Sequence, residues 1–208
     1  MSRTGRIGVF GGTFDPIHNT HLDVARAAIE QASLDRVLFV VAGNPPHKHN
    51  ATFASAEDRF ALVSAAVASE PRMEASRIEI DRPGPSFTAD TLAALKEAFP
   101  DSALSLIIGM DALVDLPRWR APKRILSLAR ILVVPRPGNW LIPDAVKGHY
   151  DVLTFTSSDV SSTEIRRRIA VGESVDALLP PAVLRYIEDR GIYNACVPEA
   201  SGDSPDAT

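Results

Sequence analysis

Short apolar runs alternate with helical patterns along most of the chain. The runs that predict strands lie at 7–10, 37–41, 104–108, 131–134 and 152–155, with a brief alternating run at 78–80. Apolar residues at helical spacing predict helices near 22–32, 56–68, 88–99, 122–128, 162–170 and 181–190. Strands that are apolar throughout are typical of a parallel sheet buried on both faces. We therefore predict an α/β fold with a single doubly wound, Rossmann-like sheet and helices on both faces.

The domain organisation predicted from this pattern is simple. No internal repeat or linker divides the chain, so we expect one domain over residues 1–195. The segment 196–208 lacks a pattern of apolar residues, which predicts a disordered C-terminal tail.

Composition narrows the class of protein. Hydrophobic residues make up 45% and charged residues 23%, as in an ordinary globular protein, and no apolar run has the length of a membrane helix. The single cysteine, Cys196, cannot form an internal disulfide, so we expect a reducing cytoplasmic location. A net charge of −4 argues against a large nucleic-acid interface but leaves room for a small phosphorylated ligand. The sequence is compatible with a monomer or a homo-oligomer.

We expect the ligand-binding residues to lie just after the predicted strands, because ligands of open α/β sheets bind beyond the carboxyl ends of the strands. After the first strand, Gly11 and Gly12 lack side chains where a backbone could approach a phosphate. His18 and His21 are three residues apart, so a helix that begins near residue 19 would point both imidazoles into one cavity. The alternative for either histidine is an ordinary structural residue.

A metal centre is the second interpretation of the histidines. His18 and His21 could combine with His47 and His49, but no carboxylate or cysteine stands near them in a fixed spacing. We therefore predict no metal ion held by the protein's own side chains.

Several further segments allow both a functional and a structural interpretation. Ser161 and Glu164 have capping-box spacing, which predicts a helix start where Ser162, Thr163 and Arg166 surround a phosphate; otherwise residues 166–168 form a solvated face. Asp111, directly after a strand, suits a ribose hydroxyl or a helix N-cap. Lys48 is a candidate phosphate clamp or plain surface, and Trp119 offers a flat stacking face or belongs to the core.

The segment Gly-Gly-Thr-Phe-Asp-Pro-Ile-His-Asn-Thr-His at 11–21 resembles the signature of the nucleotidylyltransferase superfamily. Further motifs extend the resemblance from about residue 6 to 193, and within the superfamily they are most similar to the bacterial nicotinate-nucleotide adenylyltransferase family. These motifs are Asn-Pro-Pro-His-Lys at 44–48, Pro-Ser-Phe-Thr-Ala-Asp-Thr-Leu at 85–92, Gly-Met-Asp-Ala-Leu at 109–113, Trp119, Arg-Pro-Gly at 136–138 and Val-Ser-Ser-Thr-Glu-Ile-Arg at 160–166.

The resemblance implies AMP transfer from ATP, accompanied by Mg²⁺, to nicotinate mononucleotide, giving deamido-NAD and pyrophosphate. It implies that His18, His21, Lys48 and Arg166 are catalytic and that Thr88, Ala89, Asp111 and Trp119 bind the mononucleotide. The ATP-binding residues implied are Gly11, Gly12, Thr13, Phe14, His18, His21, Gly109, Asp111, Arg136, Ser162, Thr163 and Arg166.

One position departs from the family signature. Where the family usually has glycine, this chain has Thr20, whose Cβ could crowd the nucleotide or whose hydroxyl could sit within the helix start. Two alternative functions remain: a sister enzyme acting on nicotinamide mononucleotide, phosphopantetheine or another phosphate acceptor, and a non-catalytic nucleotide-binding protein.

Overall fold

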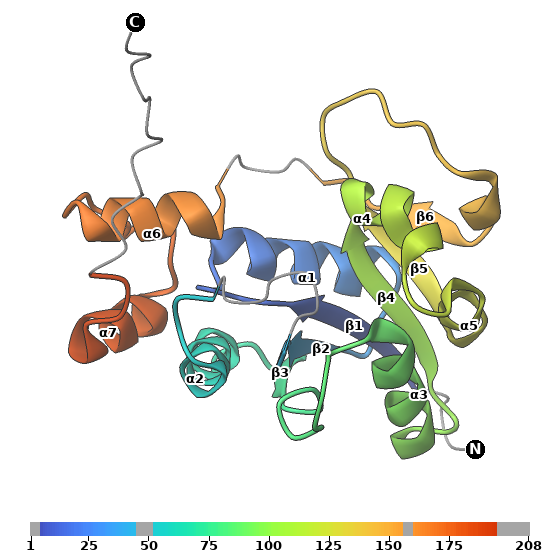
Figure 1. Ribbon diagram of the computed structural model, residues 1–208, viewed down its shortest axis with the longest axis horizontal. Coiled ribbons are helices and arrows are strands. Elements are labelled where there is room, and N and C mark those ends of the chain that lie inside the picture. The colour runs from blue at the N-terminus through green and yellow to red at the C-terminus, as the bar shows by residue number, and fades with distance from the viewer. Residues whose placement is uncertain (1–4, 45–51, 156–159, 195–208) are drawn as a thin grey trace, which may run out of the picture.

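A six-stranded parallel sheet forms the centre of the molecule, with strand order β3-β2-β1-β4-β5-β6 (Figure 1). The computed structural model describes residues 5–44, 52–155 and 160–194. The strands are β1 (Arg6–Gly12), β2 (Arg36–Val41), β3 (Met73–Ser76), β4 (Ala103–Gly109), β5 (Ala129–Val134) and β6 (Tyr150–Val152). The chain adds strands outward from β1 to β3 and then from β4 to β6, so the predicted doubly wound sheet is confirmed.

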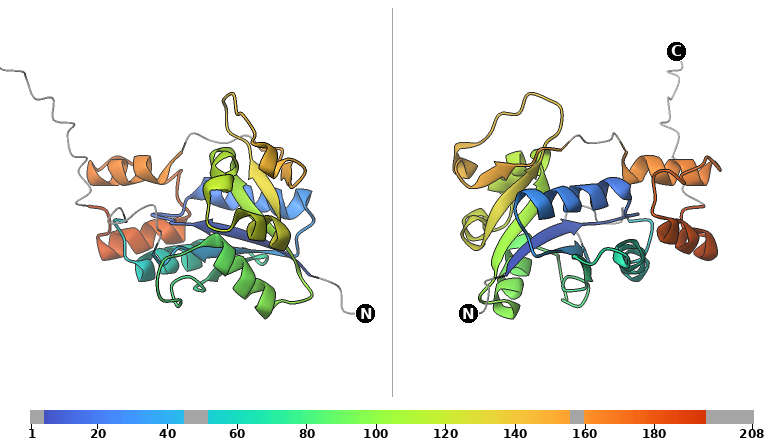
Figure 2. Two further views of the ribbon diagram at one scale, coloured as in Figure 1. Left: turned by 45° about the vertical axis from the view of Figure 1, so that its right-hand side comes forward. Right: turned by 180° about the vertical axis from the view of Figure 1, so that it is seen from behind.

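Helices cover both faces of this sheet. They are α1 (Asn19–Gln31), α2 (Ala56–Val67), α3 (Thr88–Ala98), α4 (Met110–Asp115), α5 (Pro122–Leu128), α6 (Ser162–Ala170) and α7 (Pro181–Arg190), with the 3-10 turns η1 (Leu116–Arg118) and η2 (Asp144–Val146). Both views of Figure 2 show α1 along one face of the strands and α3 along the opposite face. The six predicted helices are confirmed, and α1 begins at residue 19 as the spacing of the histidines requires.

Two hydrophobic clusters explain why the central strands carry apolar residues at consecutive positions. In β2, Val37, Phe39 and Val41 belong to the cluster that also holds the buried residues of α1, α2, α6 and α7. Leu38 and Val40 belong to the other cluster, with residues of α3, α4 and α5. Alternate side chains of one strand are therefore buried on opposite faces, as in parallel sheets generally.

The predicted strand at 78–80 is wrong. Strand β3 runs from Met73 to Ser76 and pairs with β2, whereas residues 78–80 lie in a turn that the Asp81 N–H closes by donating to the Arg77 carbonyl. Ile78 and Ile80 pack against the two hydrophobic clusters, so their alternation reflects packing of a turn. An edge strand with one buried residue gives little sequence signal.

The predicted strand at 152–155 is also displaced. Strand β6 ends at Val152. Beyond it, the Gln31 side chain accepts from the Thr154 N–H at 2.8 Å and donates to the Thr154 carbonyl at 2.9 Å. An amide from α1 thus takes the place of a strand partner at this edge of the sheet.

The fold brings the carboxyl ends of β1, β4 and β5 to one edge of the sheet. The N-termini of α1 and α6 meet there, because the Ser162 hydroxyl donates to the Pro16 carbonyl at 2.8 Å. Within the three described ranges, no helix is long and apolar enough to cross a membrane.

Candidate active site

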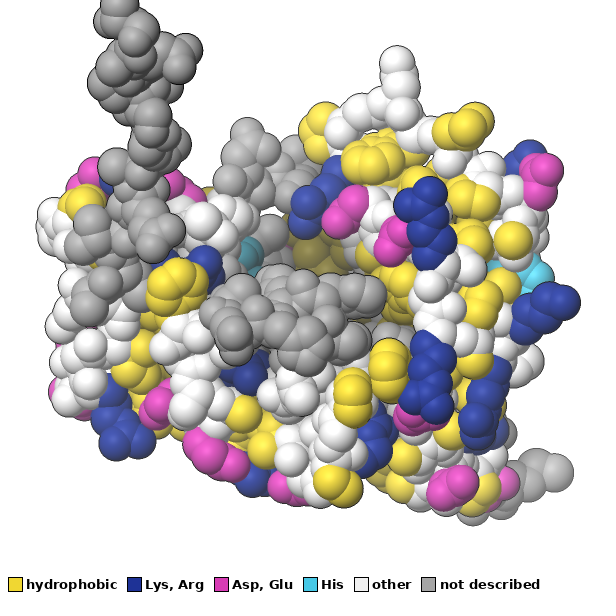
Figure 3. Space-filling view, in the orientation of Figure 1, with side chains coloured by type: hydrophobic (Ala, Val, Ile, Leu, Met, Phe, Trp, Pro, Cys, Tyr) yellow, Lys and Arg dark blue, Asp and Glu magenta, His cyan; other side chains and the backbone are white. Residues whose placement is uncertain are grey.

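Two cavities lie on either side of the loop that joins β1 to α1, and Thr13 lines both of them. The histidine cavity has a volume of about 590 Å³ and is lined by residues that include Phe14, His18, His21, Arg136 and Arg166. The tryptophan cavity has a volume of about 580 Å³ and is lined by residues that include Gly11, Gly12, Thr88 and Trp119. In Figure 3 the surface is hollowed between the end that carries α6 and the part that carries α4, and a histidine is visible inside.

Gly11 and Gly12, at the end of β1, lack a side chain for different physical reasons. A Cβ on Gly12 would lie 2.8 Å from the Phe14 ring, which is buried against Phe10 and Phe39. A Cβ on Gly11 would meet no heavy atom within 4 Å in the part of the chain that the structure describes. Gly12 is therefore required by packing within the protein, and Gly11 leaves the wall of the tryptophan cavity open.

The two histidines come together as the sequence predicts. Their ring centroids lie 3.8 Å apart, and both rings line the histidine cavity. The backbone N–H of His18 donates to Nδ1 of His21 at 3.2 Å. A neutral His21 must therefore carry its proton on Nε2, which makes that atom a hydrogen-bond donor.

Burial keeps both imidazoles uncharged near neutral pH. It lowers the pKa of His18 to about 4, and burial followed by the nearby His18 lowers the pKa of His21 well below its usual range. The pair therefore offers neutral N–H donors, and the permanent positive charge of the cavity comes from its arginines.

Arg166 is the arginine most firmly held beside the histidines. Its Nη1 donates to the Asp15 carbonyl at 2.7 Å, its Nη2 to the Thr163 hydroxyl at 3.3 Å, and its guanidinium lies 4.4 Å from the centroid of the Phe53 ring. Helix α6 begins as predicted, since the Ser161 hydroxyl accepts from the Glu164 N–H at 3.2 Å. Arg167 and Arg168 instead pair with Glu164 on the surface.

Asp111 does not cap a helix. The N-cap of α4 is Gly109, and Asp111 lies in the first turn, where its carboxylate is 3.6 Å from Nε of Arg136. Gly109 and Arg136 line the histidine cavity, whereas Asp111 is not among the lining residues of either cavity.

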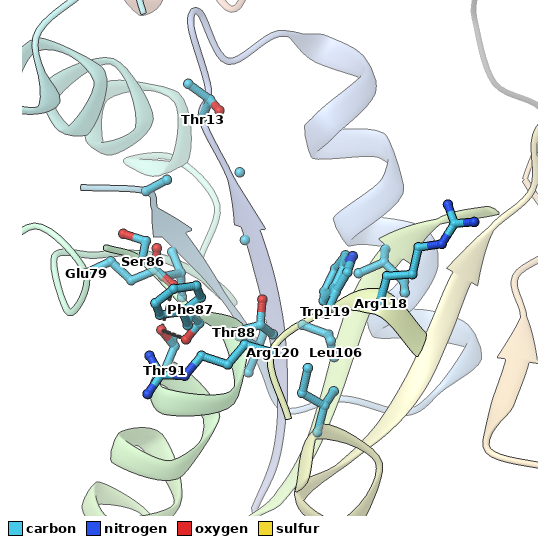
Figure 4. A pocket seen from close by; sticks show the side chains of 17 residues that line it. Thr13, Glu79, Ser86, Phe87, Thr88, Thr91, Leu106, Arg118, Trp119 and Arg120 are labelled. Atoms are coloured by element: carbon cyan, nitrogen blue, oxygen red, sulfur yellow. Dashed lines mark hydrogen bonds between the residues drawn. The ribbon is translucent and has the colours of Figure 1, made fainter. Parts of the chain in front are cut away.

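The tryptophan cavity has aromatic walls. Figure 4 shows Trp119 and Phe87 on opposite sides of it, with β1 between them. Arg120 stacks on Phe87 at 4.5 Å and pairs with Asp90 at 3.4 Å. The predicted Thr88 lines this cavity. The side chain of Ala89 is buried in the hydrophobic cluster behind α3, so only its backbone is available for the predicted contact with the mononucleotide.

Sequence reasoning missed several residues around the two cavities. Glu79 is buried in the wall of the tryptophan cavity and accepts from the Thr91 hydroxyl at 2.6 Å. Arg59, which is 1% exposed, donates to the Thr13 carbonyl at 2.8 Å. The sequence could have indicated this role, because Arg59 lies on the apolar face of α2, where a charged residue needs a buried partner. Asp15 lies within the recognised signature, yet its role could not be inferred from the sequence.

The remaining predicted residues lie outside the described part of the chain. They are Lys48, His47 and His49. Among the residues that are described, no group of three histidine, cysteine or acidic side chains could hold a metal ion.

Comparison with known proteins gives consistent matches. A model of the cytidylyltransferase-like family matches residues 9–168. A protein of Saccharopolyspora erythraea named as a probable nicotinate-nucleotide adenylyltransferase is 41% identical over 194 residues, covering 93% of this chain and 92% of the relative. A protein of Thermus thermophilus with the same name is 46% identical over 188 residues, covering 90% and 99%. The structure of Plasmodium falciparum nicotinic acid mononucleotide adenylyltransferase complexed with NaAD has the same fold, with a TM-score of 0.76, 17% identity and coverage of 91% and 98%.

The surroundings of Gly11 and Gly12 predict different losses of stability for two matched substitutions. Gly12→Ala should lower the free energy of unfolding by about 1–3 kcal/mol, because the new methyl group overlaps the buried Phe14 ring. Gly11→Ala should change it by less than about 0.5 kcal/mol. Urea denaturation of both variants measures the difference, and equal losses would contradict this account of the loop.

The buried His18 predicts a loss of stability in mild acid. Below pH 6.5 an unfolded histidine takes up a proton that the folded protein does not take up until about pH 4. The free energy of unfolding should therefore fall between pH 6.5 and 4, with a contribution on the order of 3 kcal/mol at about 1.4 kcal/mol per pKa unit. Denaturation across this range should show a smaller loss for His18→Gln than for the wild type; parallel curves would refute the assignment.

Proposed function

The chain belongs to the cytidylyltransferase-like family and, within it, to the nicotinate-nucleotide adenylyltransferases, and we propose that its two cavities hold the two substrates of AMP transfer. ATP places its phosphates in the histidine cavity, and nicotinate mononucleotide places its pyridine ring in the tryptophan cavity. The products are deamido-NAD and pyrophosphate. The observation that carries this assignment is the position of Thr13, which borders both cavities and so marks where the two substrates meet.

The histidine cavity has the chemistry of a polyphosphate site. Arg166 provides a planar guanidinium with several N–H donors, and the rings of His18 and His21 provide further N–H donors. The N-terminus of α6 adds a partial positive charge on the same side. An arriving polyphosphate would favour protonation of the imidazoles, because a nearby opposite charge stabilises their charged form.

The tryptophan cavity suits a flat, partly apolar ring. Trp119 offers a face for stacking, and Phe87 forms the opposite wall. The acceptor phosphate would then point past Thr13 toward the histidines. A pyridine mononucleotide fits these walls better than the flexible chain of phosphopantetheine, which has no ring to stack at that end.

The reaction requires no strong general base, because the phosphate of the mononucleotide is already an anion. One of its oxygens attacks the α-phosphorus of ATP, and the bond from that phosphorus to the bridging oxygen of pyrophosphate breaks with its electron pair leaving on pyrophosphate. Catalysis then consists of alignment and stabilisation of the charge that develops on the phosphoryl oxygens. Arg166, His18 and His21 supply that stabilisation, with Lys48 as a further candidate.

Mg²⁺ enters this scheme as part of the ATP substrate. The described side chains provide no cluster of acidic ligands for a resident ion, and the ATP phosphates can bring the metal with them. The cytoplasmic location predicted from the single cysteine belongs to the same proposal.

A pyrophosphate-release assay tests this function directly. With ATP, nicotinate mononucleotide should be a better acceptor than nicotinamide mononucleotide or phosphopantetheine. His21→Ala should lower kcat by about 10²–10³-fold, because a donor to the developing charge is lost. His149→Ala provides the control, since this exposed histidine lies in another cavity, beside Lys96 and Arg130.

Three results would contradict the proposal. Wild-type rates in His21→Ala would exclude the histidine cavity as the reaction centre. A preference for another acceptor would reassign the tryptophan cavity. Tight ATP binding without pyrophosphate release would favour a non-catalytic nucleotide-binding protein.

A further inference from the structure

The carboxylate of Asp15 joins three distant parts of the chain beneath the histidine cavity. It accepts from the backbone N–H groups of Phe53 at 2.8 Å and Ala54 at 3.1 Å, and from the Tyr193 hydroxyl at 2.7 Å. Asp15 is 4% exposed and Tyr193 is 5% exposed, so the hydrogen bond between their side chains is buried. The loop after β1, the residues before α2 and the residues after α7 therefore share one buried hydrogen-bonded centre.

Two features show that Tyr193 is held there by specific interactions. Its φ angle of +72° is in the left-handed region, which is unfavourable for a residue with a side chain and needs compensating contacts. Burial, and then the neighbouring Asp15, raise the pKa of Tyr193 well above its usual range. The hydroxyl therefore keeps its proton at neutral pH and remains a donor to Asp15.

The same junction determines where Arg166 lies. The Asp15 carbonyl accepts from Arg166, and Phe53, whose N–H is held by the Asp15 carboxylate, places its ring against the Arg166 guanidinium. Two of the three contacts of Arg166 thus involve Asp15 or a residue that the Asp15 carboxylate holds, and the third is to Thr163 within α6. Arg59 donates a hydrogen bond to the carbonyl of the nearby Thr13.

We propose that Asp15 and Tyr193 are positioning residues for the adenylyl transfer, acting by fixing Arg166 relative to His18 and His21. This inference rests on the proposed function. It differs from a purely structural role, in which loss of the Tyr193 hydroxyl would lower stability and leave turnover by the folded protein unchanged. A small displacement of a charge-stabilising group is known to cost up to about 100-fold in rate, so the two roles are separable by kinetics.

The central experiment compares two tyrosines that lose the same atom. Tyr193→Phe removes the donor to Asp15, and Tyr186→Phe removes a partly buried hydroxyl of α7 that donates to the Asp58 carboxylate at 3.1 Å. In the pyrophosphate-release assay with saturating ATP, Tyr193→Phe should lower kcat about tenfold and change the KM for nicotinate mononucleotide less than twofold. Tyr186→Phe should leave kcat unchanged.

A second variant tests whether Tyr193→Phe lowers kcat by displacing Arg166. In an Arg166→Lys protein, which keeps a positive charge but loses the two-pronged guanidinium, adding Tyr193→Phe should reduce kcat less than twofold further. Asp15→Asn should reproduce the loss of kcat in the wild-type background. These measurements are made at protein concentrations corrected for the folded fraction, which circular dichroism reports.

The outcomes separate this inference from the function on which it rests. A wild-type kcat in folded Tyr193→Phe, an effect confined to the KM of the acceptor, or a full tenfold loss added to that of Arg166→Lys would overturn the positioning role alone. A wild-type protein that releases no pyrophosphate with nicotinate mononucleotide would overturn the proposed function and the positioning role together.

Discussion

The site depends on how the backbone of the loop between β1 and α1 obtains its hydrogen bonds. Several carbonyl groups of this loop are partnered by side chains, because buried backbone groups must find hydrogen-bond partners. The partners are side chains from distant elements: Arg59 of α2 donates to Thr13, Arg166 of α6 to Asp15, and Ser162 of α6 to Pro16. The first amide of α1 is also satisfied from afar, because the Asn19 N–H donates to the Leu178 carbonyl. Side chains of α2 and α6, and the backbone at Leu178, therefore hold this loop and the start of α1 in place.

This arrangement gives Arg166 two roles that reinforce each other. Its guanidinium satisfies a loop carbonyl and also provides the fixed positive charge of the histidine cavity. The histidines complement it as neutral donors, because burial holds the pKa of His18 near 4 and that of His21 also below its usual range. A site of this kind is preorganised before any phosphate arrives, which is the condition under which electrostatic stabilisation is most effective.

The sequence was sufficient for the parts of the fold that have strong local signals. Strands such as β2 are buried on both faces and helices such as α6 carry a capping serine, so both were predicted closely. The edge strands β3 and β6 were misplaced because half-exposed strands have little pattern and because Gln31 replaces a strand partner at Thr154. The loops of the site were located because ligands of open α/β sheets bind beyond the carboxyl ends of the strands. The hydrogen bond between Asp15 and Tyr193 joins residues 178 positions apart and could not be inferred without the fold.

In the proposed function, the two cavities on either side of Thr13 hold the two halves of one dinucleotide. A crystal structure of the protein with deamido-NAD tests it most directly. We expect the pyridine ring against Trp119 and the adenylyl phosphate within hydrogen-bond distance of Nε2 of His21 or the guanidinium of Arg166. A product bound with its pyridine ring in the histidine cavity, or with both phosphates far from His21 and Arg166, would contradict it.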